Sequence, residues 1–317
     1  MNSIKTIIKY ELIRYFLSPL AYVYLVGFLL LSGSCAIYFG HFFMDGHASL
    51  WGLFDYQPWI YLLFIPGIAM RSWAEEFHTK SIVQILTVPV SVTDLVWGKF
   101  LASWIFAIIA ILLTFPFWIT VNILGNPDNT VIIIGYLGCF ILAGAMLAIS
   151  QTMSALTKSP VIALVLGVFV NLLFFWSGFE YVLFWARELF SDVIVDTIIS
   201  FSFLAHSLSR GLVELRDLVF FGSLIVFFNL ITIAIISLKT KGSSGLISSS
   251  SVKHGVLVLM LLFIGFFGLN IIANNVLRQI SYDFTKEKYL SLTQNTKNIL
   301  RRLERPVIAK LYYSPIL

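Results

Sequence analysis

Charged side chains gather in the stretch of residues 70–101, which lies between two apolar blocks of the chain. Glu76 precedes Lys80 by four positions, the order of acid and base that favours an ion pair along a helix. His78 lies between them and could act as a base, but no acid or nucleophile stands at a spacing that would pair with it. We therefore expect His78 to be a surface residue, and the stretch to bind a partner rather than to perform a reaction.

The same stretch predicts a short amphipathic helix over residues 74–88. Ile82, Ile85 and Leu86 fall at positions i, i+3 and i+4, which places them on one apolar ridge. Pro89 ends the helix, because proline has no backbone N–H and disfavours the helical conformation of the residue before it. A short polar helix between membrane spans can contact something outside the bilayer. Alternatively, its ridge rests on the ends of the chain's own spans.

Other candidate chemistry in the chain is weaker. His41, Asp45, His47 and Asp55 could ligate a metal, but they lack a tight ligand spacing, and an aromatic segment at the membrane interface explains them better. The sequence contains no G-x-x-x-x-G-K-[ST], H-E-x-x-H or G-x-S-x-G motif. We therefore expect no catalytic residues, no metal and no directly bound cofactor.

The composition indicates a membrane protein. Of 317 residues, 59% are hydrophobic and only 12% are charged, and the mean hydropathy is +0.91. A soluble domain carries about 25% charged residues, so this chain is all-α, a polytopic helical membrane protein. The two cysteines, Cys35 and Cys139, lie in apolar runs and indicate neither a disulfide framework nor a metal site.

The elements that must position the 74–88 helix are a series of apolar spans. Residues 1–18 predict an amphipathic helix in the membrane interface, with Lys5 and Lys9 off its apolar stripe. The second apolar block is too short to cross the bilayer alone, so it must extend past Arg71 or begin in the preceding loop. The expected spans are 19–39, 58–70 with its extension, 95–124 with a kink at Pro116, 131–153, 160–178, 218–238 and 256–272.

The remaining segments are not spans. Residues 179–217 mix aromatic and charged side chains and predict short amphipathic helices at the bilayer edge. Residues 239–254 are a Gly/Ser-rich linker with lysines, expected on the cytoplasmic side. The chain turns polar and basic from 274 to 317. The seventh span occupies 255–273.

The distribution of cations predicts the orientation. Residues 1–18, 71–99, 157–160 and 239–254 together carry ten Lys and Arg against four acids, whereas the opposite loops carry three against nine. The positive-inside rule therefore places the N-terminus and the 74–88 helix in the cytoplasm. An odd number of spans then places the tail outside, and long terminal regions translocate regardless of their charge.

Three sequence segments resemble one family. R-S-W-A-E-E (71–76), L-T-V-P-V-S (86–91) and L-V-W-G-K-F-L-A (95–102) are similar to the cytoplasmic segment of ABC-2 type transporter permeases, nearest to the gliding-motility branch. H-S-L-S-R-G-L-V-E-L-R-D (206–217) is similar to that family's extracellular segment. The resemblance covers about residues 1–240. It implies a six-span permease domain over 19–238, and a seventh span follows it.

The resemblance also implies a site. In this family the cytoplasmic segment contains a coupling helix that docks into an ATPase subunit, which here implies the helix at 74–88. The docking residues would be Glu75, Glu76, His78, Thr79, Lys80, Ile82, Ile85, Leu86 and Pro89. Lys80-Ser81 stand where relatives often have Gly-Thr, and Val83-Gln84 where a glutamate is usual.

The tail carries a second resemblance. Residues 283–314 look like the opening of the auxiliary extracytoplasmic subunit of gliding-motility ABC systems, with a helix at 293–304 and a strand at 307–313. The expected tail is thus a short α/β extracytoplasmic segment. An isolated strand cannot satisfy the hydrogen bonds of the backbone groups along its edges. We therefore expect the native polypeptide to continue into a larger auxiliary domain.

These observations predict a permease subunit of an ABC transporter in the bacterial inner membrane. Its partners would be a dimer of a separate ATPase, which supplies ATP and Mg, and a second copy of the permease or a similar permease. Auxiliary envelope proteins are further candidate partners, and no nucleic acid is expected. The alternative is a structural membrane anchor for a motility or envelope machine that moves no solute. An ATPase-stimulation assay separates the two, and the sequence leaves the substrate open.

Overall fold

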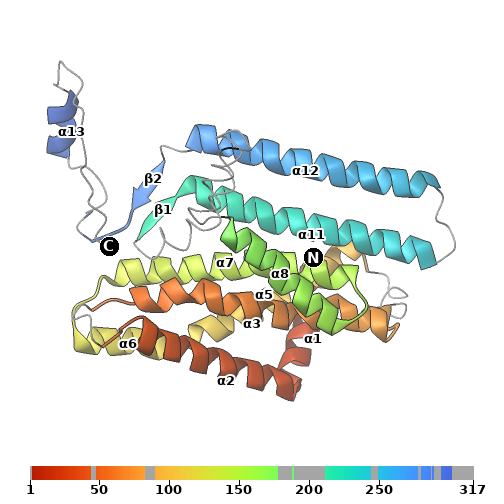
Figure 1. The fold of residues 1–317 in the computed structure, drawn as a ribbon, viewed down its shortest axis with the longest axis horizontal. Coiled ribbons are helices and arrows are strands. Elements are labelled where there is room, and N and C mark those ends of the chain that lie inside the picture. Colours follow the sequence, from red (N-terminus) through yellow and green to blue (C-terminus); the bar gives the residue numbers. More distant parts are fainter. Residues whose placement is uncertain are drawn as a thin grey trace.

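The computed structural model describes residues 2–43, 48–82, 90–177, 188, 211–243, 249–277, 280–286, 288 and 294–301. Within them the chain is mostly helical (Figure 1). The elements are α1 (Asn2–Leu17), α2 (Pro19–Ser34) with the π-helical turn η1 (Cys35–Phe39), α3 (Trp51–His78), α5 (Val92–Leu112), α6 (Phe115–Leu124), α7 (Asn129–Leu156), α8 (Pro160–Trp176), β1 (Leu212–Glu214), α11 (Leu215–Ser243), α12 (Ser249–Leu277), β2 (Ser281–Asp283) and α13 (Gln294–Arg301).

Local signals set most helix starts. Pro19 and Pro160 open α2 and α8, since proline has the backbone angle of a first helical residue and no N–H to satisfy. Ser91 caps α5 by accepting a hydrogen bond from the backbone N–H of Asp94 at 3.0 Å. Pro116 lies at the start of α6, so the predicted kink is a break between α5 and α6.

Within the described residues, five helical segments are long and apolar enough to cross a membrane: Pro19–Phe39, Val92–Leu124, Asn129–Leu156, Leu215–Lys239 and Leu257–Leu277. The short second block proves to be the middle of α3, a 28-residue helix that extends it in both directions. The shorter apolar helix α8 occupies the place of the predicted fifth span. The polytopic helical class is thus confirmed, and the count of six core spans plus one stays a prediction.

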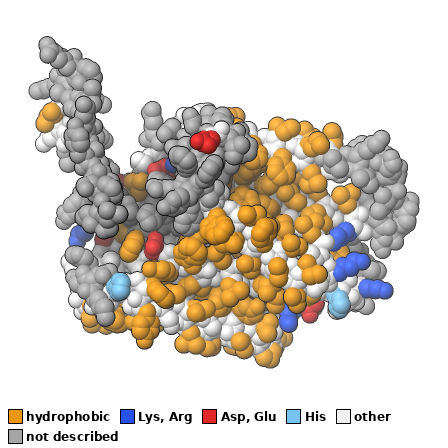
Figure 2. Space-filling model, in the orientation of Figure 1, with side chains coloured by type: hydrophobic (Ala, Val, Ile, Leu, Met, Phe, Trp, Pro, Cys, Tyr) orange, Lys and Arg blue, Asp and Glu red, His pale blue; other side chains and the backbone are white. Residues whose placement is uncertain are grey.

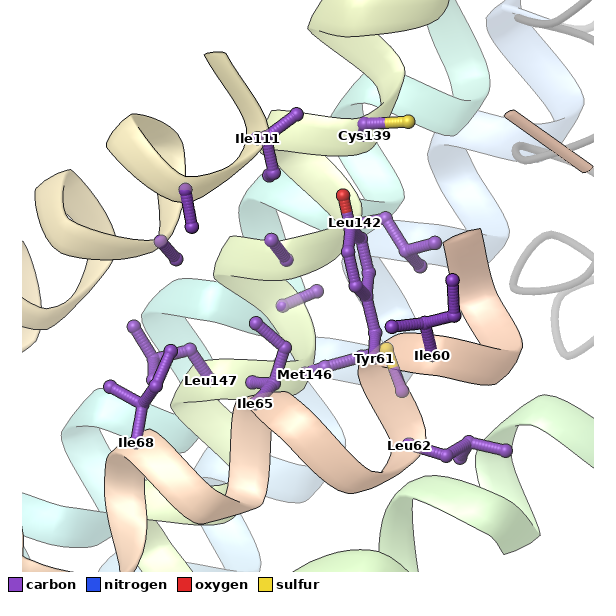
Figure 3. Packing of buried hydrophobic residues seen from close by; sticks show 14 of the residues in the cluster. Ile60, Tyr61, Leu62, Ile65, Ile68, Ile111, Cys139, Leu142, Met146 and Leu147 are labelled. Atoms are coloured by element: carbon purple, nitrogen blue, oxygen red, sulfur yellow. The ribbon is translucent and has the colours of Figure 1, made fainter. Parts of the chain in front are cut away.

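Helix α7 is the centre of the bundle. It packs against α3, α5, α8 and α11, and its span is the most buried of the five. Figure 3 shows Tyr61 and Ile65 of α3 directed at Leu142 and Met146 of α7. Glycine at position 135 makes room here, because a Cβ there would come within 2.4 Å of the Phe54 ring. Close apposition of α3 and α7 fixes the position of the charged end of α3.

Polar residues inside the bundle join neighbouring helices. The Asn171 amide of α8 donates to the Ser150 hydroxyl of α7 at 2.7 Å, and the Gln151 amide of α7 donates to the Ser103 hydroxyl of α5 at 3.2 Å. The Asn229 amide bonds the carbonyl of Ile225 in its own helix. The first two pairs satisfy polar groups that a hydrocarbon environment would leave without partners.

Several of the described cations lie together at one end of the bundle. Lys239 of α11 donates to the carbonyls of Ala155 and Leu156 at the end of α7, and its ammonium lies 4.4 Å from the ring centre of Phe77 in α3. The face in Figure 2 shows several Lys and Arg side chains at the right-hand end of the bundle, and hydrophobic side chains along its length. We call this end, where α3, α7 and α11 finish, the basic end.

The strand pair β1–β2 differs from the prediction. Residues 212–214 were expected in amphipathic helices, but they pair antiparallel with β2, Leu212 opposite Asp283. Helices α11 and α12 lie side by side (Figure 1), so the segment before α11 meets the segment after α12. The expected helices at 179–210 lie outside the described residues except at position 188.

The helix boundaries in the tail and in the 239–254 segment differ from the predicted ones. Helix α13 covers Gln294–Arg301 within the predicted 293–304, and the strand expected at 307–313 lies outside the described residues. The described parts of the 239–254 linker are helical, because α11 runs on to Ser243 and α12 begins at Ser249.

Candidate functional site

Three helices bring charged residues together at the basic end. Helix α1 contributes Glu11 and Arg14, the last turns of α3 contribute Glu75 and Glu76, and α5 contributes Lys99. We call these five residues the charge cluster. Helix α1 can approach α5 because position 98 is glycine: a Cβ there would lie 2.6 Å from Ile7 Cγ2.

Lys99 is the centre of the charge cluster. Its side chain is only 2% exposed, and its ammonium pairs with Glu76 Oε1 and, at 3.1 Å, with Glu11 Oε1. It also donates to the carbonyl of Ser72 at 3.0 Å. An ammonium has three N–H donors, so these three acceptors satisfy it. The Trp73 ring, 4.9 Å from the ammonium, closes the site.

Arg14 closes the charge cluster toward solvent. Its guanidinium lies 3.8 Å from Glu11 and 3.7 Å from each of Glu75 and Glu76, and its side chain is 44% exposed. These distances are ion-pair contacts longer than direct hydrogen bonds. Glu11 and Glu76 therefore each contact both bases, which links α1, α3 and α5 into one unit.

Two groups here have a pKa that burial shifts. Burial raises the pKa of Glu76, and Lys99 opposes that shift. Among the described residues, Glu76 Oε2 has no hydrogen-bond partner. Burial also raises the pKa of Tyr15 to about 12, so its hydroxyl stays neutral and shares a 3.0 Å hydrogen bond with Ser103.

Ser154 of α7 holds the backbone of α3 just before the charge cluster. Its hydroxyl accepts from the N–H groups of Trp73 and Ala74 at 3.2 and 3.1 Å and donates to the carbonyl of Met70 at 3.0 Å. A bundle helix thus contacts the end of α3 directly.

The chain leaves α3 sharply after the charge cluster. His78 and Thr79 are exposed, and the Thr79 hydroxyl donates to the carbonyl of Glu75 at 2.9 Å. Lys80 has a φ of +59°, in the left-handed region that turns the chain out of the helix. His78, Thr79 and Lys80 form what we call the tip.

Ile82 turns back toward the protein. It is buried against Trp73, Leu95, Val96, Ala155 and Ile236. For this residue the structure matches the alternative in which the ridge rests on the chain's own helix ends. Ile85, Leu86 and Pro89 lie outside the described residues.

The nine residues proposed for docking thus fall into different environments. His78, Thr79 and Lys80 are exposed, Glu75 is half-buried, and Glu76 and Ile82 are buried. The expected Glu76–Lys80 pair is wrong: Glu76 points inward to Lys99, and Lys80 lies past the end of α3.

Sequence reasoning missed the contributions of Glu11, Arg14 and Lys99. A signal was present, since Glu11 lies on the apolar stripe of α1 beside Leu12 and Lys99 is enclosed by apolar neighbours in V-W-G-K-F-L. A lone charge on an apolar helix face needs a partner on another helix. In the described residues no three His, Cys, Asp or Glu side chains could together hold a metal ion, and Asp45 and His47 lie outside them.

Comparison with known families gives a match over the N-terminal part of the chain. Residues 8–174, more than half of the chain, match the family described as ABC-2 family transporter protein. The matched region runs from α1 to α8 and contains the whole charge cluster. Comparisons with curated proteins and with solved structures found no match.

Proposed function

Because the chain belongs to the ABC-2 family of transporter proteins, we propose that it couples ATP hydrolysis by a separate ATPase subunit to movement of its own helices. It is a multi-pass membrane protein of a family whose members are membrane components of ABC transporters without an ATPase of their own. ATP and Mg would be bound by the partner.

The observation that carries the proposal is the connection between the tip and the charge cluster. The tip projects from α3 directly after Glu75 and Glu76, and Lys99 joins Glu76 to α5 and to α1. A force on the tip therefore reaches three helices through a buried ionic contact. Closure of an ATPase dimer against the tip would move these helix ends as a rigid body between two packings.

The docking surface follows from exposure. We assign the first contact with the ATPase to His78, Thr79 and Lys80, with Glu75 at its edge. Ile85, Leu86 and Pro89, which lie outside the described residues, keep the docking role that the family resemblance implies. Glu76 and Ile82 are buried in the permease itself. We therefore assign them to holding the docking surface in place rather than to contact with the ATPase.

The proposed setting is a bacterial inner membrane with the basic end in the cytoplasm. Lys80, Lys158 and Lys239 belong to this end, as do the cations of α1. β1 and β2 then lie on the periplasmic side with the tail. A second copy, or a similar permease, would complete the pathway, and the tail would contact or begin an auxiliary domain of the gliding-motility type.

The test is retention of the ATPase on purification. The variant His78→Ala with Lys80→Glu changes only exposed side chains, so the permease should stay folded in the membrane. Loss of a charged contact costs about 1.5–3 kcal/mol, so ATPase affinity should fall at least about tenfold. Leu86→Glu tests the rest of the surface. Lys158→Glu, an exposed charge reversal at the same end, is the matched control.

Normal ATPase stoichiometry both in the His78→Ala, Lys80→Glu variant and in Leu86→Glu would remove residues 74–88 from the coupling role. Equal loss in the Lys158→Glu control would show only that the end needs positive charge. Ile82→Glu is unsuitable, because it places a carboxylate in a buried apolar cluster and damages the permease itself. ATP hydrolysis that no candidate solute changes would favour a structural membrane anchor over a transporter.

A further inference from the structure

A cavity of about 150 Å³ opens beside the charge cluster, between α1, α2 and α3. Its lining has two unlike parts. Glu11, Arg14, Arg71 and Glu75 supply charged groups, whereas Leu20, Ala21, Tyr24, Ile68 and Phe106 supply an apolar wall.

The charged part contains both signs in equal number. Arg14 has carboxylates at 3.7–3.8 Å but none at hydrogen-bond distance. Arg71 is exposed and takes part in no ion pair within the described residues. Glu75 contacts only Arg14, at 3.7 Å, among those ion pairs. Two guanidinium groups and a carboxylate thus retain capacity for a ligand.

The apolar part of the lining borders a second, much smaller cavity. Tyr24, Ile68 and Phe106 also line this cavity of about 20 Å³ between α2, α3 and α5, which has room for about one water molecule. The rest of its wall is uncharged and largely aromatic and aliphatic: Leu25, Phe28, Tyr61, Phe64, Ile65, Ala107, Ala110 and Ile111. The larger cavity thus places charged groups of both signs beside an apolar wall, and further apolar side chains lie behind that wall.

We propose that this site binds a zwitterionic phospholipid with a primary ammonium group, of the phosphatidylethanolamine type. The phosphate lies against Arg71 and Arg14, the ammonium lies against Glu75, and one acyl chain begins along the apolar wall formed by Leu20, Ala21 and Tyr24. An anionic headgroup would bring no ammonium to Glu75, whose ion-pair partner among the described residues is Arg14 at 3.7 Å. A quaternary ammonium would offer Glu75 charge without an N–H donor.

A lipid in this position would contact α1, α2 and α3 at once. The bound lipid would then be a permanent component of the permease, and it would stabilise the contact between α1 and α3. The proposal needs no ATPase, so it stands or fails independently of the docking role.

Thermal unfolding of the full chain in detergent, after removal of native lipid, tests the site. Short-chain phosphatidylethanolamine should raise the unfolding temperature more than the phosphatidylcholine or phosphatidylglycerol of equal chain length. Arg71→Gln and Glu75→Gln should each weaken phosphatidylethanolamine binding at least about tenfold. Lys9→Gln, an exposed cation of α1 outside the cavity, should bind as the native chain does.

Several results would overturn the proposal. Equal stabilisation by the three lipids would indicate a general solvent effect, and a preference for phosphatidylglycerol would refute the role of the carboxylates. Equal binding of soluble phosphoethanolamine, which lacks chains, would indicate a site for a free phosphate ester. Unchanged binding in both Arg71→Gln and Glu75→Gln would place the lipid elsewhere; both side chains reach the cavity surface, so these variants should fold.

Discussion

At the scale of single residues, Lys99 decides how the basic end holds together. Burying an ammonium is costly, and here the cost is offset by two carboxylates and a carbonyl around the same nitrogen. The arrangement has a consequence: removal of the ammonium leaves the buried Glu76 and Glu11 with the partly exposed Arg14, at 3.7 and 3.8 Å, as their shared cation.

We therefore expect Lys99→Met to destabilise the protein by about 3–5 kcal/mol, the range for breaking a buried ion pair from one side. The measurement is thermal or denaturant unfolding in detergent. The double variant Lys99→Met with Glu76→Gln should recover much of the loss, because it leaves no uncompensated charge at position 76. A double variant as unstable as the single one would show that packing, rather than charge, makes Lys99 important.

At the scale of elements, the crossing of α1 over α5 depends on Gly98. A Cβ at this position would meet Ile7 at 2.6 and 2.8 Å, and isoleucine is stiff near its backbone. The two helices thus approach too closely for any side chain at position 98, and this approach brings Glu11 to Lys99.

Gly98→Ala should accordingly cost about 1–3 kcal/mol of stability through overpacking and make the N-terminal helix more sensitive to protease. Ile7→Ala in the same chain should restore most of the loss. Gly222→Ala in α11 is the matched control, because a Cβ there would have no neighbour within 4 Å. A Gly98→Ala protein as stable as the native chain would mean that α1 is loosely held.

The elements also show what the sequence can predict. Pro19, Pro160, Ser91 and Pro116 act on their own backbone, so the helix boundaries near them could be expected from sequence alone. The Lys99–Glu11 contact joins positions far apart in sequence, and the lone charges hint at a partner without naming it. The pairing of β1 with β2 is harder still to predict from the sequence, because the two strands meet only when α11 and α12 lie side by side.

At the scale of the whole molecule, the helices divide the chain into two unlike ends. The basic end holds the charge cluster, the tip and Lys239, and the opposite end holds β1, β2 and the start of α7. There Asp128, next to the first residue of α7, accepts a hydrogen bond from the backbone N–H of Lys286 at 2.7 Å. The tail is therefore attached to the end away from the proposed ATPase contact.

Orientation in the membrane is the last prediction, and it follows from this division. If the basic end faces the cytoplasm, a cysteine at Ser249, where α12 begins, should resist a membrane-impermeant thiol reagent in intact cells. A cysteine at Tyr282, which lies in β2 and is 57% exposed, should react readily. Cys35 and Cys139 would first be replaced by serine and alanine, so that only the introduced thiol reports. Permeabilised cells should label both positions, which controls for local accessibility.

The reverse pattern in intact cells would invert the orientation of the protein in the membrane, and with it the side from which an ATPase could reach the tip. Labelling of both positions in intact cells would place α12 outside the membrane and reduce the spans to those that precede it.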